Sequence, residues 1–209
     1  MKKHGLLFVN GEVTEKEVGI IRHRTFDKII AADGGVHHAL RFGFTPDVVV
    51  GDLDSITETV HAQLPGTQFV HRPSQELNDL EKALQYCQEH GFSQLTILGI
   101  AGKRLDHTIN NFSVLARYDR FFELELYDAY ARIYLIRDEI QIQGQKGQLV
   151  SLIPVGKVEG ITTEGLAFPL NNESLEFGVR EGLSNYLTRK QARVRFRKGL
   201  LLVFVHYAE

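Results

Sequence analysis

The sequence predicts an α/β N-terminal domain with a mainly parallel, doubly wound sheet, followed by a small all-β sandwich domain. Apolar runs without polar alternation, such as Val48-Val49-Val50, are typical of strands buried on both faces of a parallel sheet. Up to about residue 128, such runs alternate with segments whose apolar residues recur at helical spacing. Beyond it, short strand-like runs are separated by glycines and no helical period is found. We therefore expect one domain over residues 1–128 and a second over 129–209.

The expected elements follow in order along the chain. In the first domain, strands are predicted at residues 5–9, 26–32, 48–50, 67–71, 94–100 and 122–127. Helices with apolar residues three or four positions apart are predicted around residues 36–42, 60–64, 80–89 and 105–116. In the second domain, strands are predicted at residues 133–136, 149–154, 161–163, 166–170, 193–196 and 200–205.

Composition excludes several classes of function. The 209 residues are 43% apolar and 24% charged, which is ordinary for a globular protein. A net charge of −2 gives no general attraction to nucleic acid or membranes. Cys87 is the single cysteine, so an intrachain disulfide and a cysteine-built metal cluster are excluded. Neither a membrane span nor a signal peptide is predicted, and we expect a cytoplasmic protein.

Two aspartates directly follow the apolar run at residues 48–50. Asp52 and Asp54 lie two residues apart, so on an extended backbone their side chains point the same way. The carboxyl end of a buried strand is where open α/β sheets bind ligands, and Mg²⁺ prefers oxygen ligands such as carboxylates and phosphates. This pattern predicts a metal-phosphate site. Alternatively, Asp54 caps the next helix with Ser55 or Thr57, and Asp52 is only solvated.

Two further strand-to-helix connections carry polar residues. Asp33-Gly34-Gly35 is suited to bind phosphate through backbone N–H groups at a helix start; alternatively, it is a tight strand-to-helix turn with Asp33 as the helix cap. Asn78 and Asp79 open the helix predicted at residues 80–89. Both are explained as helix caps, and Asp79 alternatively adds a third carboxylate to the site.

The segment at residues 99–107 is the fourth polar strand end. Lys103 and Arg104 are suited to neutralise phosphate charge, and arginine fits planar, bidentate binding. Asp106 is a helix cap, a metal ligand or a general base, and His107 reads as an ordinary helix-start residue. Polar segments at four strand ends exceed what helix capping requires. In the second domain, Ser184 and Asn185 either form a turn or bind a ligand ring.

Taken together, these segments resemble the thiamine pyrophosphokinase family. Each motif is short, but five of them in register are specific. They follow the family's order and cover most of the chain from the second strand to the end: Ala32–Gly35, Pro46-Asp47 with Gly51–Ser55, Asn78–Leu84, Gly102–Thr108, and Gly165-Leu166 with Phe168–Leu170 and Ser184-Asn185.

The resemblance implies a catalytic α/β domain, a thiamine-binding β-sandwich, and a homodimer whose thiamine site is shared between subunits. The implied reaction transfers pyrophosphate from ATP to the thiamine hydroxyl and releases AMP. By resemblance, Mg²⁺ is held by Asp52, Asp54 and Asp79, and Asp106 lies close to the attacking hydroxyl. Nucleotide contacts are implied for Asp33, Gly34, Gly35, Gln75, Arg104 and His107, and thiamine contacts for Ser184 and Asn185.

The chain departs from the family pattern at three positions. The family commonly has Thr where Asn78 stands, often Lys where Gln75 stands, and typically Glu where Tyr186 follows Ser-Asn. Two other functions fit the same residues. One is an Asp-x-Asp transferase that uses a nucleotide sugar, and the other is a non-catalytic protein that binds thiamine or a nucleotide.

Overall fold

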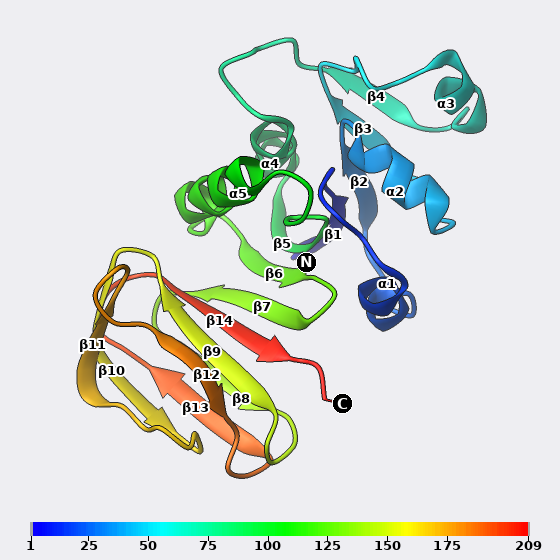
Figure 1. Ribbon diagram of the computed structural model, residues 1–209. Helices are drawn as coiled ribbons and strands as arrows, with labels where there is room; N and C mark the ends of the chain where they lie inside the picture. Colours follow the sequence, from blue (N-terminus) through cyan, green and yellow to red (C-terminus); the bar gives the residue numbers. More distant parts are fainter. Residues whose placement is uncertain (1, 209) are drawn as a thin grey trace. The chain divides into compact units, whose positions relative to one another are not determined.

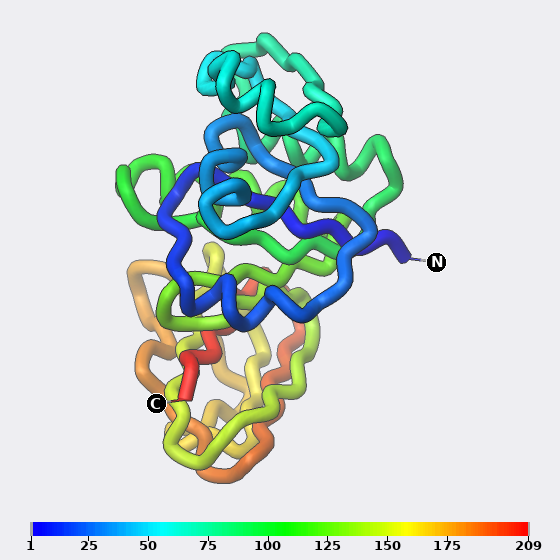
Figure 2. The backbone as a smooth tube through the Cα atoms, turned by 90° about the vertical axis from the view of Figure 1, so that its right-hand side faces the viewer, coloured from blue at the N-terminus to red at the C-terminus, as the bar shows by residue number. Residues whose placement is uncertain are grey.

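The computed structural model describes residues 2–208, and the chain divides after Ala129 into two compact units. Figures 1 and 2 colour the first unit from blue to green and the second from yellow-green to red. The expected fold class is confirmed. The first unit is built on a parallel sheet with helices, and the described part of the second consists of antiparallel strands.

The first unit alternates strands and helices. The strands are β1 (Lys3–Phe8), β2 (Lys28–Ala32), β3 (Val48–Gly51), β4 (Gln68–His71), β5 (Phe92–Leu98) and β6 (Glu123–Tyr127). The helices are α1 (Glu15–Ile21), α2 (Gly35–Arg41), α3 (Glu58–Gln63), α4 (Asp79–Glu89) and α5 (Leu105–Tyr118). Every strand pair in this unit is parallel, in the order β6-β5-β1-β2-β3-β4.

The strand order reverses between β1 and β5, which are neighbours in the sheet. Helices α1, α2 and α3 lie on one side of the sheet, and α4 and α5 lie on the other (Figure 1). The chain therefore leaves β1 and β5 toward opposite faces, and their loops diverge at the carboxyl edge. A crevice at such a reversal point is where doubly wound folds bind ligands.

Strand β3 shows why the sequence folds this way. Its three valines are completely buried, because helices cover both faces of the sheet. Val49 packs in one apolar cluster with Ala31, Val36, Val60 and Leu64. Through this cluster, α2 and α3 pack against one face of β2 and β3. This packing fixes the carboxyl end of β3, from which the candidate aspartates project.

Helix α1 lies outside the elements that the sequence predicts. It is only seven residues long, so its apolar periodicity is weak. Its start is nevertheless encoded, because Thr14 and Glu17 form a capping box in which the Thr14 N–H donates to the Glu17 carboxylate at 2.7 Å. Glu17 is fully buried, so this cap also satisfies a carboxylate inside the fold.

The second unit contains two antiparallel sheets. The strands are β7 (Ala131–Ile136), β8 (Glu139–Gln143), β9 (Leu149–Pro154), β10 (Lys157–Glu164), β11 (Asn171–Glu176), β12 (Gly182–Tyr186), β13 (Gln191–Arg195) and β14 (Leu201–His206). The order is β12-β9-β14-β7 in one sheet and β11-β10-β13-β8 in the other. One apolar cluster combines residues of both sheets, including Leu152, Val203, Ile161 and Val194, as in a sandwich.

The prediction of a strand at residues 166–170 is wrong. Leu166 makes only an isolated bridge with Leu187, and the rest of the segment is a loop. Its apolar residues mislead because Leu166 and Leu170 reach the core from this loop. Strands β8, β11 and β12 were not predicted, since their polar residues hide the alternation.

None of the helices within residues 2–208 combines the length and the apolar character that crossing a membrane requires.

Candidate functional site

A cavity of about 250 Å³ opens at the carboxyl edge of the parallel sheet, between the loops that follow β1 and β5. Its position matches the reversal point of the strand order. The lining comes from the loops after β1 and β5, the end of β2, and the first turns of α4 and α5: Val9, Asn10, Gly11, Ala32, Asn78, Asp79, Leu80, Ile100, Gly102, Lys103, Arg104, His107, Thr108 and Asn111.

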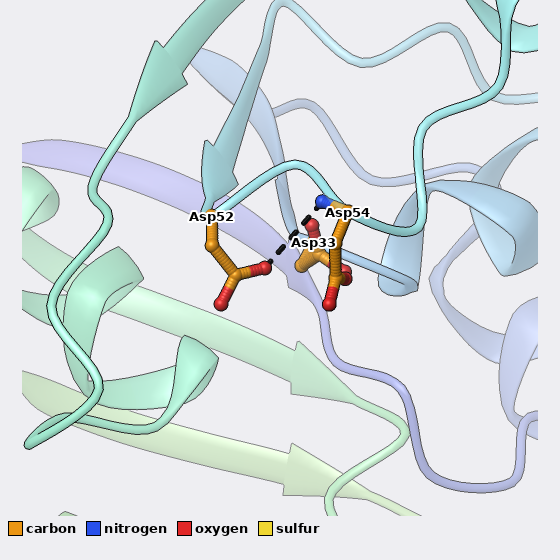
Figure 3. Close-up of side chains that lie close together, drawn as sticks. All are labelled: Asp33, Asp52 and Asp54. Carbon is orange, nitrogen blue, oxygen red and sulfur yellow. Dashed lines mark hydrogen bonds between the residues drawn. The ribbon is translucent and has the colours of Figure 1, made fainter.

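Three aspartates meet at the same edge of the sheet. Carboxylate oxygens of Asp33, Asp52 and Asp54 all lie within 4.8 Å of one another. Figure 3 shows the three side chains converging from the loop after β2 and the loop after β3. Asp33 is 2% exposed, whereas Asp54 is exposed, so the group runs from the interior of the unit to its surface. Clustered carboxylate oxygens are suited to a hard divalent cation.

The expectation of an extended backbone between Asp52 and Asp54 is wrong. Strand β3 ends at Gly51, and Leu53 has φ of 65°, in the left-handed region that a bulky residue rarely adopts. The Leu53 N–H donates to Asp33 Oδ1 at 3.0 Å, which holds this turn. Two carboxylates two residues apart therefore converge through a tight turn rather than through strand alternation. Strained backbone of this kind concentrates at functional sites.

Asp33 is not the cap of α2. The N-cap of α2 is Gly34, which makes no side-chain cap bond, and the Asp33 carboxylate instead accepts from Leu53. Gly51 is explained by the same contact, because a Cβ at Gly51 would lie 2.6 Å from Asp33 Cβ. Gly35 is likewise required by packing, since a Cβ there would lie 2.2 Å from the Phe8 carbonyl oxygen. Close approach within the fold therefore accounts for both glycines.

The structure shows which of the candidate residues cap helices α3 and α4. Helix α3 is capped by Thr57, whose hydroxyl accepts from the Val60 N–H at 3.3 Å, so Asp54 is not needed there. Helix α4 is capped by Asn78, whose Oδ1 accepts from the Glu81 N–H at 2.8 Å. Asn78 therefore has a structural role, whereas Asp52, Asp54 and Asp79 do not serve as helix N-caps.

Lys82 connects the aspartates of β3 and α4. Its ammonium donates to Asp52 Oδ2 at 2.9 Å and to Asp79 Oδ1 at 3.1 Å, and the side chain is 2% exposed. Burial acts to lower the pKa of Lys82, but the two carboxylates outweigh it and raise the pKa above its usual value. Lys82 is therefore a buried, charged cation that ties Asp79 to the three-aspartate group.

The two carboxylates beside Lys82 respond in opposite directions. The hydrogen bond from Lys82 lowers the pKa of Asp52. Loss of water around Asp79 raises its pKa, and the nearby charges of Asp33 and Asp52 act in the same direction, against the pull of Lys82. Asp79 lies outside the group of three whose oxygens lie within 4.8 Å, so its metal-binding role stays a prediction.

The basic side of the cavity is built on the loop after β5. The Arg104 Nε donates to Asp106 Oδ1 at 3.1 Å, and its terminal nitrogen bonds the second oxygen. This pairing lowers the pKa of Asp106 to about 2, so the carboxylate is a weak proton acceptor while the pair stands. Arg104 also occupies the N-cap position of α5, which excludes the Asp106 side chain as the cap.

Of two predicted nucleotide contacts, His107 lies in the cavity lining and Gln75 does not. His107 lines the cavity together with Arg104, as its predicted role requires. Gln75 is exposed on the loop before α4, where its amide donates to the Pro73 carbonyl at 3.4 Å, and it is not part of the cavity lining. Arg72, from the same loop, bonds Gln85 and Glu89 of α4.

In the second unit, Ser184 and Asn185 differ sharply. Ser184 is exposed and has φ of 57°, and its N–H donates to the Ser151 hydroxyl at 3.1 Å. Asn185 is 5% exposed. Its Oδ1 accepts from the N–H groups of Phe168 and Tyr186, and its Nδ2 donates to the Phe168 carbonyl at 2.8 Å. The Asn185 amide therefore holds the loop at residues 165–170 in place.

Two residues beside the site, Lys82 and Asn10, are not predicted as site residues from the sequence. Lys82 lies within a helix whose sequence pattern indicates only an apolar face. Its spacing of three residues from Asp79 does, however, predict an ion pair. Asn10, at the end of β1, accepts both hydrogen bonds of the Lys103 ammonium shown by the structure, each at 2.9 Å. Its position in an Asn-Gly pair indicates only a turn.

Comparison with known families covers both units. Residues 23–127 match the family profile described as "Thiamin pyrophosphokinase, catalytic domain". Residues 137–201 match the profile described as "Thiamin pyrophosphokinase, vitamin B1 binding domain".

Individual relatives agree with the profiles. Thiamine pyrophosphokinase 1 of Arabidopsis thaliana is 33% identical over 179 residues, which cover 78% of this chain and 66% of the relative. Thiamine pyrophosphokinase of Bacillus subtilis is 28% identical over 181 residues, or 83% and 85% of the two chains. A crystal structure of the Bacillus subtilis enzyme superimposes with a TM-score of 0.84 at 25% identity, over 99% of this chain and 100% of that one. The Candida albicans structure has a TM-score of 0.83 at 16% identity, over 99% and 90%, which supports the fold alone.

Proposed function

The chain belongs to the thiamine pyrophosphokinase family, and on this premise we propose that it transfers pyrophosphate from ATP to the hydroxyl of thiamine. In this reaction the hydroxyl oxygen loses its proton and bonds to the β-phosphorus, the bond from that phosphorus to the α–β bridging oxygen breaks, and AMP leaves. The observation that carries the proposal is the match of both units, in order, to the two domains of one family. The comparisons favour this function over the sugar-nucleotide transferase and over the non-catalytic binder.

The three-aspartate group fits a magnesium ion by its chemistry. Asp33, Asp52 and Asp54 offer oxygen ligands within 4.8 Å of one another, and Mg²⁺ prefers carboxylate and phosphate oxygens. In our proposal these residues hold the cation, and Asp79 completes the acidic edge. A bound Mg²⁺ would neutralise phosphate charge as the pyrophosphoryl group is transferred.

Lys82 keeps this acidic edge in one arrangement. Its ammonium fixes Asp52 and Asp79 by direct hydrogen bonds and offsets part of their mutual repulsion. Carboxylates held by a buried partner lose little conformational freedom when a ligand arrives, which is how a site becomes preorganised. We therefore assign Lys82 a positioning role.

The basic side of the cavity is proposed to bind the phosphates of ATP. Arg104 and His107 line it, and the Asp106 carboxylate holds the Arg104 guanidinium in a fixed orientation. Because Asp106 has a pKa of about 2, it remains charged at neutral pH, which suits an orienting or ligating group better than a proton acceptor. Pyrophosphate transfer needs mainly positioning and charge neutralisation, which the three-aspartate group and the basic side of the cavity are proposed to offer.

The second unit is proposed to bind thiamine through the exposed Ser184 hydroxyl. Asn185 supports this surface by holding Phe168 through both backbone groups. From the family we also infer a homodimer with a thiamine site shared between subunits. Large exposed apolar side chains at Phe168, Leu183 and Phe177 are consistent with a surface that is covered in an assembly. Analytical ultracentrifugation of the purified protein tests whether it is a homodimer. A cytoplasmic location stays a prediction.

The test of the function is a reaction with purified protein, ATP, Mg²⁺ and thiamine. We expect stoichiometric AMP and thiamine diphosphate, and loss of both products when EDTA removes the cation. Release of ADP with thiamine monophosphate would contradict pyrophosphate transfer. Turnover of a nucleotide sugar, or tight thiamine binding without any product, would favour one of the two alternatives.

A further inference from the structure

Asn10 lies between the glycine-rich loops that follow β2 and β5. It lies in the loop after β1, two residues beyond Phe8, and its Oδ1 and its carbonyl oxygen each accept a hydrogen bond from the Lys103 ammonium at 2.9 Å. On its other side, the Asn10 amide lies over Gly34, because a Cβ at Gly34 would be 2.5 Å from Asn10 Nδ2. Asn10 thus touches the loop after β2 and binds the loop after β5.

The backbone around Asn10 is also fixed. The Gly11 N–H donates to the Gly99 carbonyl at 2.8 Å, and the Glu12 N–H donates to the Ala101 carbonyl at 2.6 Å. Gly11 has no room for a side chain, since a Cβ would lie 2.2 Å from the Ala101 oxygen. The segment that carries Asn10 is therefore tied to the loop that carries Lys103, and both line the cavity.

Lys103 is an unusual residue for its backbone conformation. Its φ is 55°, in the left-handed region that costs a non-glycine residue on the order of 1 kcal/mol, and it follows Gly102 with φ of 88°. Glycine would adopt this conformation without that cost. A lysine here directs its side chain back onto Asn10 at the wall of the cavity.

The three cations beside the cavity differ in how their charge is balanced. Lys82 donates to two carboxylates, and Arg104 is paired with Asp106. Lys103 is held by an amide and a carbonyl oxygen, which are neutral. An ammonium has three N–H donors, and Asn10 accepts from two, which leaves one donor and a full positive charge for a ligand. The ligand chemistry that fits is an anionic oxygen.

We propose that Lys103 binds a phosphate oxygen of the nucleotide in this cavity and that Asn10 is the residue that positions it. The proposal rests on the proposed pyrophosphokinase function, because that function supplies the nucleotide. It adds to the site a cation that is fixed in place by a neutral partner. Replacing that partner with a carboxylate should keep the hydrogen bonds but cancel the charge.

The experiment measures ATP affinity by titration calorimetry without thiamine, so that binding is separated from turnover. Lys103→Met should weaken ATP binding about tenfold, because a charge-assisted hydrogen bond is lost. Asn10→Ala should weaken it several-fold, and the double variant should be no worse than Lys103→Met alone. Asn10→Asp should also weaken it, since the new carboxylate neutralises Lys103. The matched control is Lys3→Met, at the amino end of β1, which should change nothing.

Each outcome bears on the proposal. Unchanged ATP affinity in Lys103→Met overturns it, and so does an Asn10→Asp variant that binds ATP like the native protein. Additive effects in the double variant would remove Asn10 as the residue that positions Lys103. If Asn10→Ala fails to fold, Lys103→Met still decides, because that side chain is exposed. A native protein that binds ATP but makes no AMP would contradict the proposed function and leave this inference standing.

Discussion

The two units use the polar residues that the sequence singles out in opposite ways. In the α/β unit, aspartates from separate loops turn toward one another, and their oxygens gather within 4.8 Å. In the β unit, the Asn185 amide turns inward and bonds the backbone of Phe168 and Tyr186. A side chain whose hydrogen-bonding groups are satisfied by its own fold has little left for a ligand. The comparison therefore separates residues that hold a loop from residues that can bind a substrate.

The largest expected effect tests the acidic edge. Asp52→Asn should lower kcat about 100-fold or more, because one of the carboxylates proposed to hold the cation is lost. Steady-state AMP production measures this effect, and thermal unfolding should show a Tm that is lowered but still cooperative, because the buried Lys82 ammonium then has a neutral acceptor in place of the Asp52 carboxylate. Asp47→Asn is the matched control, since it removes the same charge at the other end of β3, where the carboxylate accepts from the Ile29 N–H at 2.7 Å. Near-native kcat in Asp52→Asn would place this carboxylate outside the site.

The second prediction concerns the buried cation of the same edge. Lys82→Met should lower kcat roughly tenfold, because Asp52 and Asp79 lose the contact that fixes them. It should also destabilise the protein by about 1–3 kcal/mol, measured by urea unfolding. Lys3→Met, which removes an exposed lysine of the same unit, is the control for charge. Loss of stability with a native kcat would restrict Lys82 to holding α4 in place.

The third prediction turns to the β unit. Asn185→Ala should lower the free energy of unfolding by about 1–3 kcal/mol, since part-buried backbone groups of Phe168 and Tyr186 lose their partner. Thermal unfolding measures the change, and Asn110→Ala, at an exposed position of α5, should have little effect. A native Tm combined with a large rise in the thiamine KM would instead make Asn185 a direct substrate contact.

The smallest expected effect belongs to Ser184. Its hydroxyl is exposed, so Ser184→Ala should change the free energy of unfolding by no more than about 0.5 kcal/mol. The thiamine KM should rise about 3- to 10-fold through loss of one hydrogen bond, while the ATP KM stays constant. Initial-rate kinetics with each substrate varied in turn separates the two constants. An equal rise in both would remove Ser184 from the thiamine site.

The sequence predicts much of the fold because a strand that is buried on both faces is an uninterrupted apolar run in the sequence. Val48-Val49-Val50 is recognisable as a central strand without knowledge of its neighbours. Helix α1 and strand β12 are harder to recognise from sequence. Helix α1 is short, and β12 is rich in polar residues. The loop at residues 166–170 was predicted as a strand because Leu166 and Leu170 are buried from an irregular backbone.

The candidate site divides in the same way. The positions of Asp52, Asp54, Asp79 and Arg104 at strand or helix ends follow from local patterns, and the family resemblance follows from their order. Lys82 could not be assigned from sequence, since a lysine on a helix is usually solvated, and only packing shows it to be 2% exposed.

By itself, the sequence determined the fold class, the two-part organisation and the family, because each depends on residue periodicity and on motif order. The tertiary structure decided which side chains meet. It brought Asp33 to Asp52 and Asp54 through the strained turn at Leu53, placed Lys82 between two carboxylates, and gave Lys103 a neutral partner in Asn10. The physical reason is that contacts between distant segments depend on strand order and loop geometry, and spacing along the chain records neither.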